Sequence, residues 1–274
     1  MRYIGGDVRE EGCIFCNRLA ADNDVRSLVL HRSGHSFVIM NLYPYNTGHV
    51  MAVPNAHKAN LDALDEPTLI DMATLLPKVV TSLRRVLNCD GFNIGLNLGA
   101  DAGAGVAQHL HQHVVPRWEG DANFMPILAG TMVIPEVIPA TYAKIRAELD
   151  RVLDGTSTFD IVVISDEERP AAWLRDGTIP TVSPDGDTPV WRAARAAIAT
   201  EGAEIVGWSG ASSTAGSERR PGLVLRTQGM PTSGDWHAVP LRAPGDDVDA
   251  ETAATLARSR ENLFPWIDAA EGHE

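Results

Sequence analysis

Four short apolar runs in the first half of the chain are bounded by Gly, Pro and Asn. They are HSFVIMNL, HVMAVP, GFNIGLNLG and HLHQHVVP, at residues 35–42, 49–54, 91–99 and 109–116. Short segments rich in β-branched and apolar residues between turn formers are typical of β-strands. The first half is therefore predicted to contain a sheet of at least these four strands.

Apolar residues recur at helical spacing between the second and third of these runs. They are Leu69, Met72, Leu75, Leu76, Val79, Val80, Leu83 and Leu87. Asp65 or Glu66 can cap this helix and Pro67 suits its first turn. Pro77 is expected to kink or split it, because proline lacks the amide hydrogen that the helix needs. A second helix is predicted over roughly 139–153.

The pattern changes after residue 152. Strands are predicted at FDIVVIS (159–165), AEIVGWSG (203–210) and GLVLRTQG (222–229), and helices at PVWRAARAAIAT (189–200) and RSRENLFPWI (258–267). The last helix is expected to dock through Leu263, Phe264 and Trp266. We therefore expect an α+β fold, an antiparallel sheet with helices, over residues 1–152. A smaller α/β or α+β domain is expected over residues 153–274.

Composition and charge narrow the class of protein. The 274 residues carry a net charge of −13, which argues against a nucleic-acid or membrane-surface binder, since both need a basic surface. There is no apolar run of about 18 residues and no secretory apolar segment at the start. Three cysteines do not make a disulfide scaffold. These features predict a cytoplasmic globular protein.

Three histidines at alternate positions carry the candidate chemistry. On a strand, His109, His111 and His113 would point to one face, about 6.6 Å apart per pair. A solvated histidine row, a catalytic zinc held by three histidines, and nucleophilic catalysis by an imidazole are the interpretations that the spacing leaves open. In the last, a neutral histidine attacks phosphorus and forms a phosphoramidate.

The surrounding motifs make a resemblance specific. The stretches NLYPYNTGH, GFNIGLNLG and the histidine row with two apolar residues after it resemble the histidine-triad superfamily of nucleotide hydrolases and transferases. The diadenosine tetraphosphate phosphorylase branch is the most similar. The resemblance covers about residues 10–150 and leaves the remainder unassigned, with no catalytic motif in it.

The resemblance implies a role for each matching residue. His111 would be the nucleophile on the α-phosphorus, and His113 would bind the phosphate and assist the leaving group. His49 would orient the cluster. Asn41 matches a ribose-binding position and Asn97 a phosphate-contacting one.

A glycine-rich loop, GADAGAGVAQ at residues 99–108, directly precedes the histidines. Its backbone amides can approach phosphate closely, so Gly103, Ala104 and Gly105 are candidate substrate-binding residues. At Ala104 and Gly105 the resembling hydrolases carry Gln and then Ser or Thr, and the phosphorylases carry Gly and then Ser. Both water and phosphate therefore stay open as acceptors. Arg117, just beyond the histidines, is a further candidate for the distal phosphates.

Cys13 and Cys16 have the spacing of metal ligands or of a redox pair, and alone they do not distinguish the two. In similar histidine-triad proteins, a histidine after the second strand and the first histidine of the triad complete a structural zinc site. His57 and His109 occupy these positions. The resemblance therefore implies a zinc ion held by these four residues, and no organic cofactor.

The function predicted is a nucleotidyl transferase or phosphorylase that acts on a dinucleoside polyphosphate through a nucleotidyl-His111 intermediate. Two alternatives remain. One is a specialised nucleotide phosphohydrolase or nucleotidyl transferase of a biosynthetic pathway. The other is a non-catalytic nucleotide-binding module. The expected partners are a nucleotide and either phosphate or water, with no nucleic acid and no membrane. By resemblance, a homodimer is expected.

Overall fold

The computed structural model describes residues 11–121, 136–167, 170–210, 220–232, 234–241 and 248–271. The chain divides into two compact units of nearly equal length, Met1–Pro135 and Glu136–Glu274. This division lies earlier than the expected boundary after residue 152. The reason is that helix α5 (Ile138–Leu153) packs against strands of the second unit.

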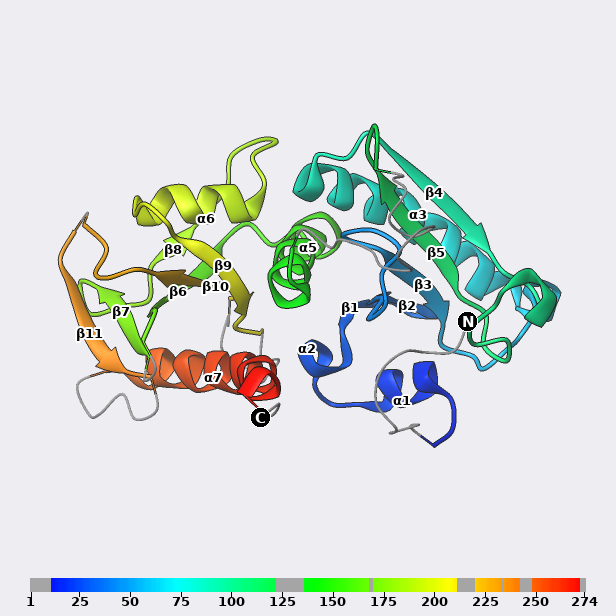
Figure 1. Ribbon diagram of the computed structural model, residues 1–274, viewed down its shortest axis with the longest axis horizontal. Coiled ribbons are helices and arrows are strands. Elements are labelled where there is room, and N and C mark those ends of the chain that lie inside the picture. The colour runs from blue at the N-terminus through cyan, green and yellow to red at the C-terminus, as the bar shows by residue number, and fades with distance from the viewer. Residues whose placement is uncertain are drawn as a thin grey trace. The chain divides into compact units, whose positions relative to one another are not determined.

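The first unit is built on an antiparallel sheet with the strand order β1-β2-β3-β5-β4 (Figure 1). The expected strands are present, and β1 adds a fifth. Their bounds are β1 (Val29–Arg32), β2 (Ser36–Met40), β3 (Val50–Pro54), β4 (Gly91–Leu96) and β5 (Gln112–Arg117). Every residue of β2 and β3 is buried, so the centre of the sheet is the core of this unit.

Helix α3 (Glu66–Leu87) packs against β2, β3 and β5. The Asp65 carboxylate caps it by accepting a bond from the Thr68 amide at 3.1 Å. The expected split at Pro77 does not occur, and the helix continues through this residue. Pro77 and Ala73 both lie on the exposed side of the helix. Water can therefore reach the Ala73 carbonyl, which loses its usual partner to the proline.

Short helices complete the described part of the first unit. These are α1 (Ile14–Ala20), α2 (Asp24–Ser27) and the 3₁₀ turns η1 (Leu61–Ala63) and η2 (Ala100–Ala102). Helix α1 has seven residues, too few to be stable by itself in water. Its position therefore depends on its contacts, of which the buried Phe15 is one.

The second unit contains a mixed sheet with the order β11-β7-β6-β10-β9, and β8 pairs with β6. The central pair, β6 and β10, is parallel, while the other pairs are antiparallel. The bounds are β6 (Phe159–Ser165), β7 (Ala171–Arg175), β8 (Thr181–Val182), β9 (Glu204–Trp208), β10 (Gly222–Thr227) and β11 (Trp236–Pro240). Strands β7, β8 and β11 are additions to those predicted.

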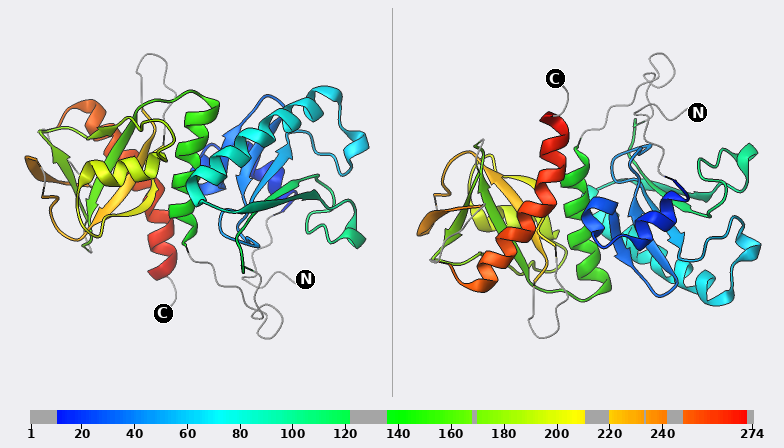
Figure 2. Two further views of the ribbon diagram at one scale, coloured as in Figure 1. Left: turned by 90° about the horizontal axis from the view of Figure 1, so that it is seen from above. Right: turned by 90° about the horizontal axis from the view of Figure 1, so that it is seen from below.

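Helices cover both faces of this second sheet. Helix α7 (Ala250–Glu271) crosses one face and α6 (Val190–Ile198) lies over the other (Figure 2). Leu256 and Leu263 of α7 pack in a cluster with Val162, Ile164 and Val224 of the sheet. The docking of Leu263 is thus confirmed, whereas the side chains of Phe264 and Trp266 lie outside the described residues. No described helix is long and apolar enough to cross a membrane.

Gly48, the residue before His49, offers a test of how strongly the backbone is constrained at this point of the fold. Gly48 has φ +75°, and a Cβ atom there would lie 2.3 Å from Leu87 Cδ1. We expect Gly48→Ala to lower the free energy of unfolding by about 1–3 kcal/mol, mainly through the left-handed backbone, while the Leu87 side chain has to shift. Urea unfolding measures the change.

The matched control is Gly34→Ala, because Gly34 has no heavy atom within 4 Å of its added Cβ. This substitution should change the unfolding free energy by no more than about 0.5 kcal/mol. Equal effects of the two substitutions would contradict the constraint that the left-handed backbone and the Leu87 contact place on Gly48.

Candidate active site and metal centre

The histidine row does not lie on one face of a strand. Strand β5 begins at Gln112, which pairs with Ala52 of β3, so His109 and His111 precede the paired segment. The expectation that all three histidines share one strand face is therefore wrong. His109 lies among the cysteines, while His111 and His113 remain neighbours, with ring centroids 4.9 Å apart at 71°.

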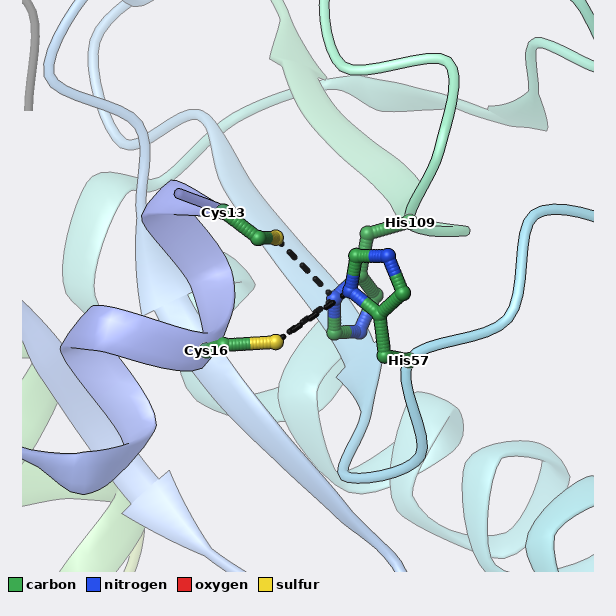
Figure 3. A group of neighbouring side chains, drawn as sticks. All are labelled: Cys13, Cys16, His57 and His109. Atoms are coloured by element: carbon green, nitrogen blue, oxygen red, sulfur yellow. Dashed lines mark hydrogen bonds between the residues drawn. The ribbon is translucent and has the colours of Figure 1, made fainter. Parts of the chain in front are cut away.

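Four predicted ligands form one cluster (Figure 3). The ligand atoms of Cys13, Cys16, His57 and His109 all lie within 4.8 Å of one another. His109 Nδ1 is 3.3 Å from Cys13 Sγ and 3.6 Å from Cys16 Sγ, and His57 Nδ1 is 3.2 Å from Cys16 Sγ. Cys13 caps α1 and Cys16 lies in it, so this short helix brings the two sulfurs together. The cluster could bind a metal ion.

The other nitrogen of His109 selects its tautomer. His109 Nε2 donates to the Pro54 carbonyl oxygen at 2.9 Å, which leaves a lone pair on Nδ1 directed at the cysteines. Burial lowers the pKa of His109. Burial and then Cys13 raise the pKa of the Cys16 thiol, and a bound cation has the opposite effect on a thiol.

His111 has a defined tautomer too. Its Nδ1 donates to the His109 carbonyl oxygen at 2.9 Å, so Nε2 holds the lone pair. Burial lowers the pKa of His111, and the bond to the His109 carbonyl partly opposes that shift. The ring of Phe15 packs between the histidines, with centroids 5.0 Å from His111 and 5.4 Å from His109. His111 is thus a neutral base held against an apolar wall.

His113 is paired with His49. His49 Nε2 lies 2.9 Å from His113 Nδ1. His49 Nδ1 faces two donors, the Tyr45 amide at 3.1 Å and the Asn41 side-chain amide at 3.2 Å. A nitrogen that accepts from donors carries no proton, so the His49 proton is on Nε2 and is donated to His113. His113 then carries its own proton on Nε2.

Both members of this pair are neutral at pH 7. Burial lowers the pKa of His49 to about 3, with a further contribution from His113 and then His111. Burial, followed by His111, lowers the pKa of His113 to about 4. The ring of Tyr45 lies over the pair, with centroids 4.8 Å from His49 and 5.8 Å from His113.

The two predicted asparagines differ in their surroundings. Asn97 directly follows β4, whose last residue, Leu96, pairs with Gln112 beside His111. This position is compatible with a phosphate contact. The Asn41 side chain contacts His49 and the Tyr43 amide, so the structure gives it partners other than ribose.

The Arg117 guanidinium already has partners within the protein. It forms a bidentate ion pair with Asp121, at 2.5 and 2.7 Å, and Nη1 donates to Asn93 Oδ1 at 2.7 Å. The Asp121 pair raises the pKa of Arg117. Asn46 also donates to Asp121 at 2.8 Å. These contacts hold the end of β5, and phosphate binding by Arg117 stays a prediction.

The glycine-rich loop is surface-exposed at its centre. Gly103 has φ +84° with no heavy atom within 4 Å of a Cβ position, and it is followed by turns up to His109. The backbone is therefore accessible at Gly103 and Gly105, with Ala104 half-buried between them. Phosphate binding by this loop stays a prediction.

Sequence reasoning missed two aromatic residues at the site. Phe15 lies inside the CIFC motif, where it resembles an ordinary apolar residue, and Tyr45 lies in an apparent turn. Their proximity to the motif residues was the available signal, since Tyr45 is four residues before His49.

Comparison with known proteins matches the HIT domain family model to residues 23–120. The AP-4-A phosphorylase of Mycobacterium tuberculosis is 40% identical over 129 residues, which cover 47% of this chain and 66% of that protein. The chain thus spans just under two thirds of this relative's length. The asymmetrical bis(5'-nucleosyl)-tetraphosphatase of Schizosaccharomyces pombe is 35% identical over 97 residues, 35% of this chain and 53% of that protein.

A solved structure of a Zn-bound histidine triad family protein from Mycobacterium smegmatis is 25% identical, with a TM-score of 0.43, and covers 53% of this chain and 97% of that one. A HIT-like protein of Methanocaldococcus jannaschii is 33% identical over 111 residues, 40% of this chain and 83% of that protein. The extent of this last match, together with the domain match, shows that the chain belongs to the histidine-triad family.

Proposed function

We propose that this protein is a nucleotidyl transferase that cleaves a dinucleoside polyphosphate at the α-phosphorus. The hydrogen bond from His111 Nδ1 to the His109 carbonyl carries the proposal, because it leaves Nε2 as an unprotonated nucleophile at neutral pH. The names of the tuberculosis phosphorylase and the yeast tetraphosphatase support this substrate class.

In the first step, His111 Nε2 attacks the α-phosphorus. A P–N bond forms and the P–O bond to the leaving group breaks. The polyphosphate leaves as an anion, and the His113 Nε2–H group donates a hydrogen bond to the departing oxygen while His113 Nδ1 continues to accept from His49. The nucleotidyl group is then held on His111.

In the second step, the acceptor attacks the same phosphorus and the P–N bond breaks. The electron pair of that bond returns to His111 Nε2, which restores the starting arrangement. A phosphate ion attacks through an ionised oxygen, whereas water releases its proton to the solvent. Phosphate as acceptor converts diadenosine tetraphosphate to ATP and ADP, and water gives ATP and AMP. The resemblance to phosphorylases favours phosphate, although Gly105 stands where they carry Ser.

Backbone amides of residues 103–105 and the Asn97 side chain would bind the phosphates, since the loop is open at Gly103 and directly precedes the histidines. This mode of binding needs no basic surface, and it is therefore compatible with the net charge of −13.

We propose that Cys13, Cys16, His57 and His109 hold a structural zinc ion. Ligand atoms of a tetrahedral zinc site stand about 3.4–3.8 Å apart, and the described sulfur–nitrogen distances are 3.2–3.6 Å. Four protein ligands leave no open position, so the ion would supply structural stability and no reaction step. Its effect would be to hold His109, whose carbonyl orients His111.

The alternative functions differ in what they require. A biosynthetic phosphohydrolase or nucleotidyl transferase would share the His111 chemistry, with a different leaving group. A non-catalytic binding module has no need of a neutral nucleophile beside a hydrogen-bond donor, and this arrangement favours an enzyme.

A homodimer and a cytoplasmic location stay predictions. Strand β4 lies at the edge of its sheet with Asn93, Ile94 and Gly95 exposed, which is compatible with pairing to a second copy.

We expect the protein to convert diadenosine tetraphosphate to ATP and ADP in the presence of phosphate, as measured by chromatography of the products. His111→Gln should lower the rate by at least about 10³-fold and abolish the acid-labile nucleotidyl adduct in a single turnover. His237→Gln, a change of an exposed histidine in the second unit, is the control and should retain activity. A fully active His111→Gln variant would refute the nucleophile assignment.

We expect the purified protein to contain one equivalent of zinc by elemental analysis. Cys16→Ser should lose most of it and unfold at lower temperature, because the ligand set becomes incomplete. The third cysteine, Cys89, lies outside the cluster and is buried, so Cys89→Ala should keep the metal. Equal zinc contents in the two variants would contradict the assigned ligands.

The neutral His49–His113 pair predicts acid sensitivity. Both folded-state pKa values, about 3 and about 4, lie below the unfolded value of about 6.5. Between these limits the unfolded chain binds protons that the folded chain does not. The free energy of unfolding should therefore fall as pH drops from 6.5 to 4.

The variant His49→Gln isolates this contribution. As the pH falls from 6.5 to 4, the free energy of unfolding of wild type should decrease by up to about 1.4 kcal/mol per pH unit more than that of the variant. Urea unfolding at each pH measures both values. The exposed His237→Gln variant should keep the wild-type slope. Identical slopes for wild type and His49→Gln would show that His49 is not held neutral.

A further inference from the structure

We propose that the loop Asn41–Tyr45 determines which nitrogens of His49 and His113 carry protons, and that Asn41 is a positioning residue acting through His49. The proposal rests on the proposed nucleotidyl transfer, since it concerns the Nε2–H group with which His113 would bind the leaving oxygen. It adds a role to a residue that the resemblance connects with ribose alone.

The orientation of the Asn41 amide follows from its two neighbours. The Tyr43 backbone amide donates to Asn41 Oδ1 at 3.0 Å, so the oxygen end is fixed toward Tyr43. The NH₂ end must then face His49 Nδ1, 3.2 Å away. The Asn41 backbone amide also donates to the His49 carbonyl oxygen at 3.0 Å, which joins the two ends of the loop.

A second donor from the same loop reaches the same nitrogen. The Tyr45 backbone amide lies 3.1 Å from His49 Nδ1. Two N–H groups directed at one imidazole nitrogen exclude a proton from it, because the alternative places hydrogen against hydrogen in a buried site. His49 is 0% exposed, so water cannot relieve the conflict.

The consequence is passed on to His113. With its proton on Nε2, His49 donates to His113 Nδ1 at 2.9 Å, and His113 must keep its own proton on Nε2. If His49 carried the proton on Nδ1 instead, His113 would donate to it and present a lone pair on Nε2. A lone pair there repels the anionic leaving oxygen and offers it no hydrogen bond.

Few other groups act on His49. In the part of the chain that is described, His113 and His111 are the titratable side chains whose charge affects it, and the Tyr45 ring packs over it. Its two loop donors are uncharged amides. The proton arrangement is therefore set by hydrogen-bond direction and not by a neighbouring carboxylate.

The test is Asn41→Asp in the full-length protein, with the imidazole nitrogens labelled by ¹⁵N. The wild-type NMR spectrum should show His49 as a neutral ring protonated on Nε2 from pH 5.5 to 9. The carboxylate introduced by this substitution is an acceptor of the same shape as the amide, so it should place a proton on His49 Nδ1 and raise the pKa of this ring. The His49 signals are identified by their loss in His49→Gln.

Asn88→Asp is the matched control, because Asn88 is the exposed C-cap of α3 and the substitution adds the same charge. It should leave the His49 spectrum unchanged. If Asn41→Asp does not fold, Asn41→Ala removes one of the two donors and should populate the Nδ1–H form measurably. An unchanged His49 spectrum in the folded Asn41 variant overturns the proposal.

The kinetic readout is the pH dependence of kcat with diadenosine tetraphosphate. In Asn41→Asp, deprotonation of His49 at high pH leaves its proton on Nδ1 and inverts the pair. We expect kcat to fall at least about tenfold below wild type at pH 8.5, and less at pH 6. A substrate without ribose 2'- and 3'-hydroxyls should show the same loss.

A loss that disappears with this substrate would mean that Asn41 acts on ribose, and it overturns the positioning role. If wild type turns over neither substrate, the proposed function fails instead, and the NMR result still decides whether the loop sets the protons on His49.

Discussion

The arrangement of the candidate site depends on His109, which makes three interactions in three directions. Its Nδ1 faces the two cysteines, its Nε2 donates to Pro54 at the end of β3, and its carbonyl accepts from His111. One residue thus joins the metal-binding cluster, the sheet and the proposed nucleophile. A displacement of His109 would therefore alter both the ligand set and the tautomer of His111.

The direction of hydrogen bonds, and not charge, differentiates the three histidines of the row. In each ring, one nitrogen has a hydrogen-bond partner. That partner either requires a proton on this nitrogen or excludes one from it. For His109 and His111 the partner is a carbonyl oxygen, and for His113 it is the N–H of His49. The other nitrogen is then left free for the proposed role, as metal ligand in His109, nucleophile in His111 or hydrogen-bond donor in His113. Three chemically identical side chains can take three roles because the backbone around them differs.

Much of the first unit followed from the sequence, because its strands and its long helix have clear periodicity and end at turn formers. The four-residue metal cluster was also predicted, through resemblance, although its members are far apart in the chain. The path of the backbone through the histidine row was not predicted. Alternation of side chains requires a paired strand, and the ladder starts only at Gln112. Before it, the Leu110 amide bonds to Lys58, outside the sheet.

Other differences have similar physical causes. Helical periodicity in α5 indicates a buried face but not which sheet buries it, so the sequence did not place this helix with the second compact unit. The pairing of Arg117 with Asp121 depends on the bend after β5, which the sequence does not display. Asn41 matched a family position, yet its hydrogen bonds depend on how the loop folds back on His49.

Helix α1 connects metal supply to the shape of the site. The seven-residue segment carries Phe15 between the two cysteines, and this ring is 4% exposed and packs on His109 and His111. A helix of this length gains its order from its contacts. Binding of the proposed metal ion and the docking of Phe15 against His111 would therefore form one cooperative event. A newly made chain would complete the packing around His111 only on acquiring the proposed ion, so metal supply would set the fraction of molecules with an ordered site.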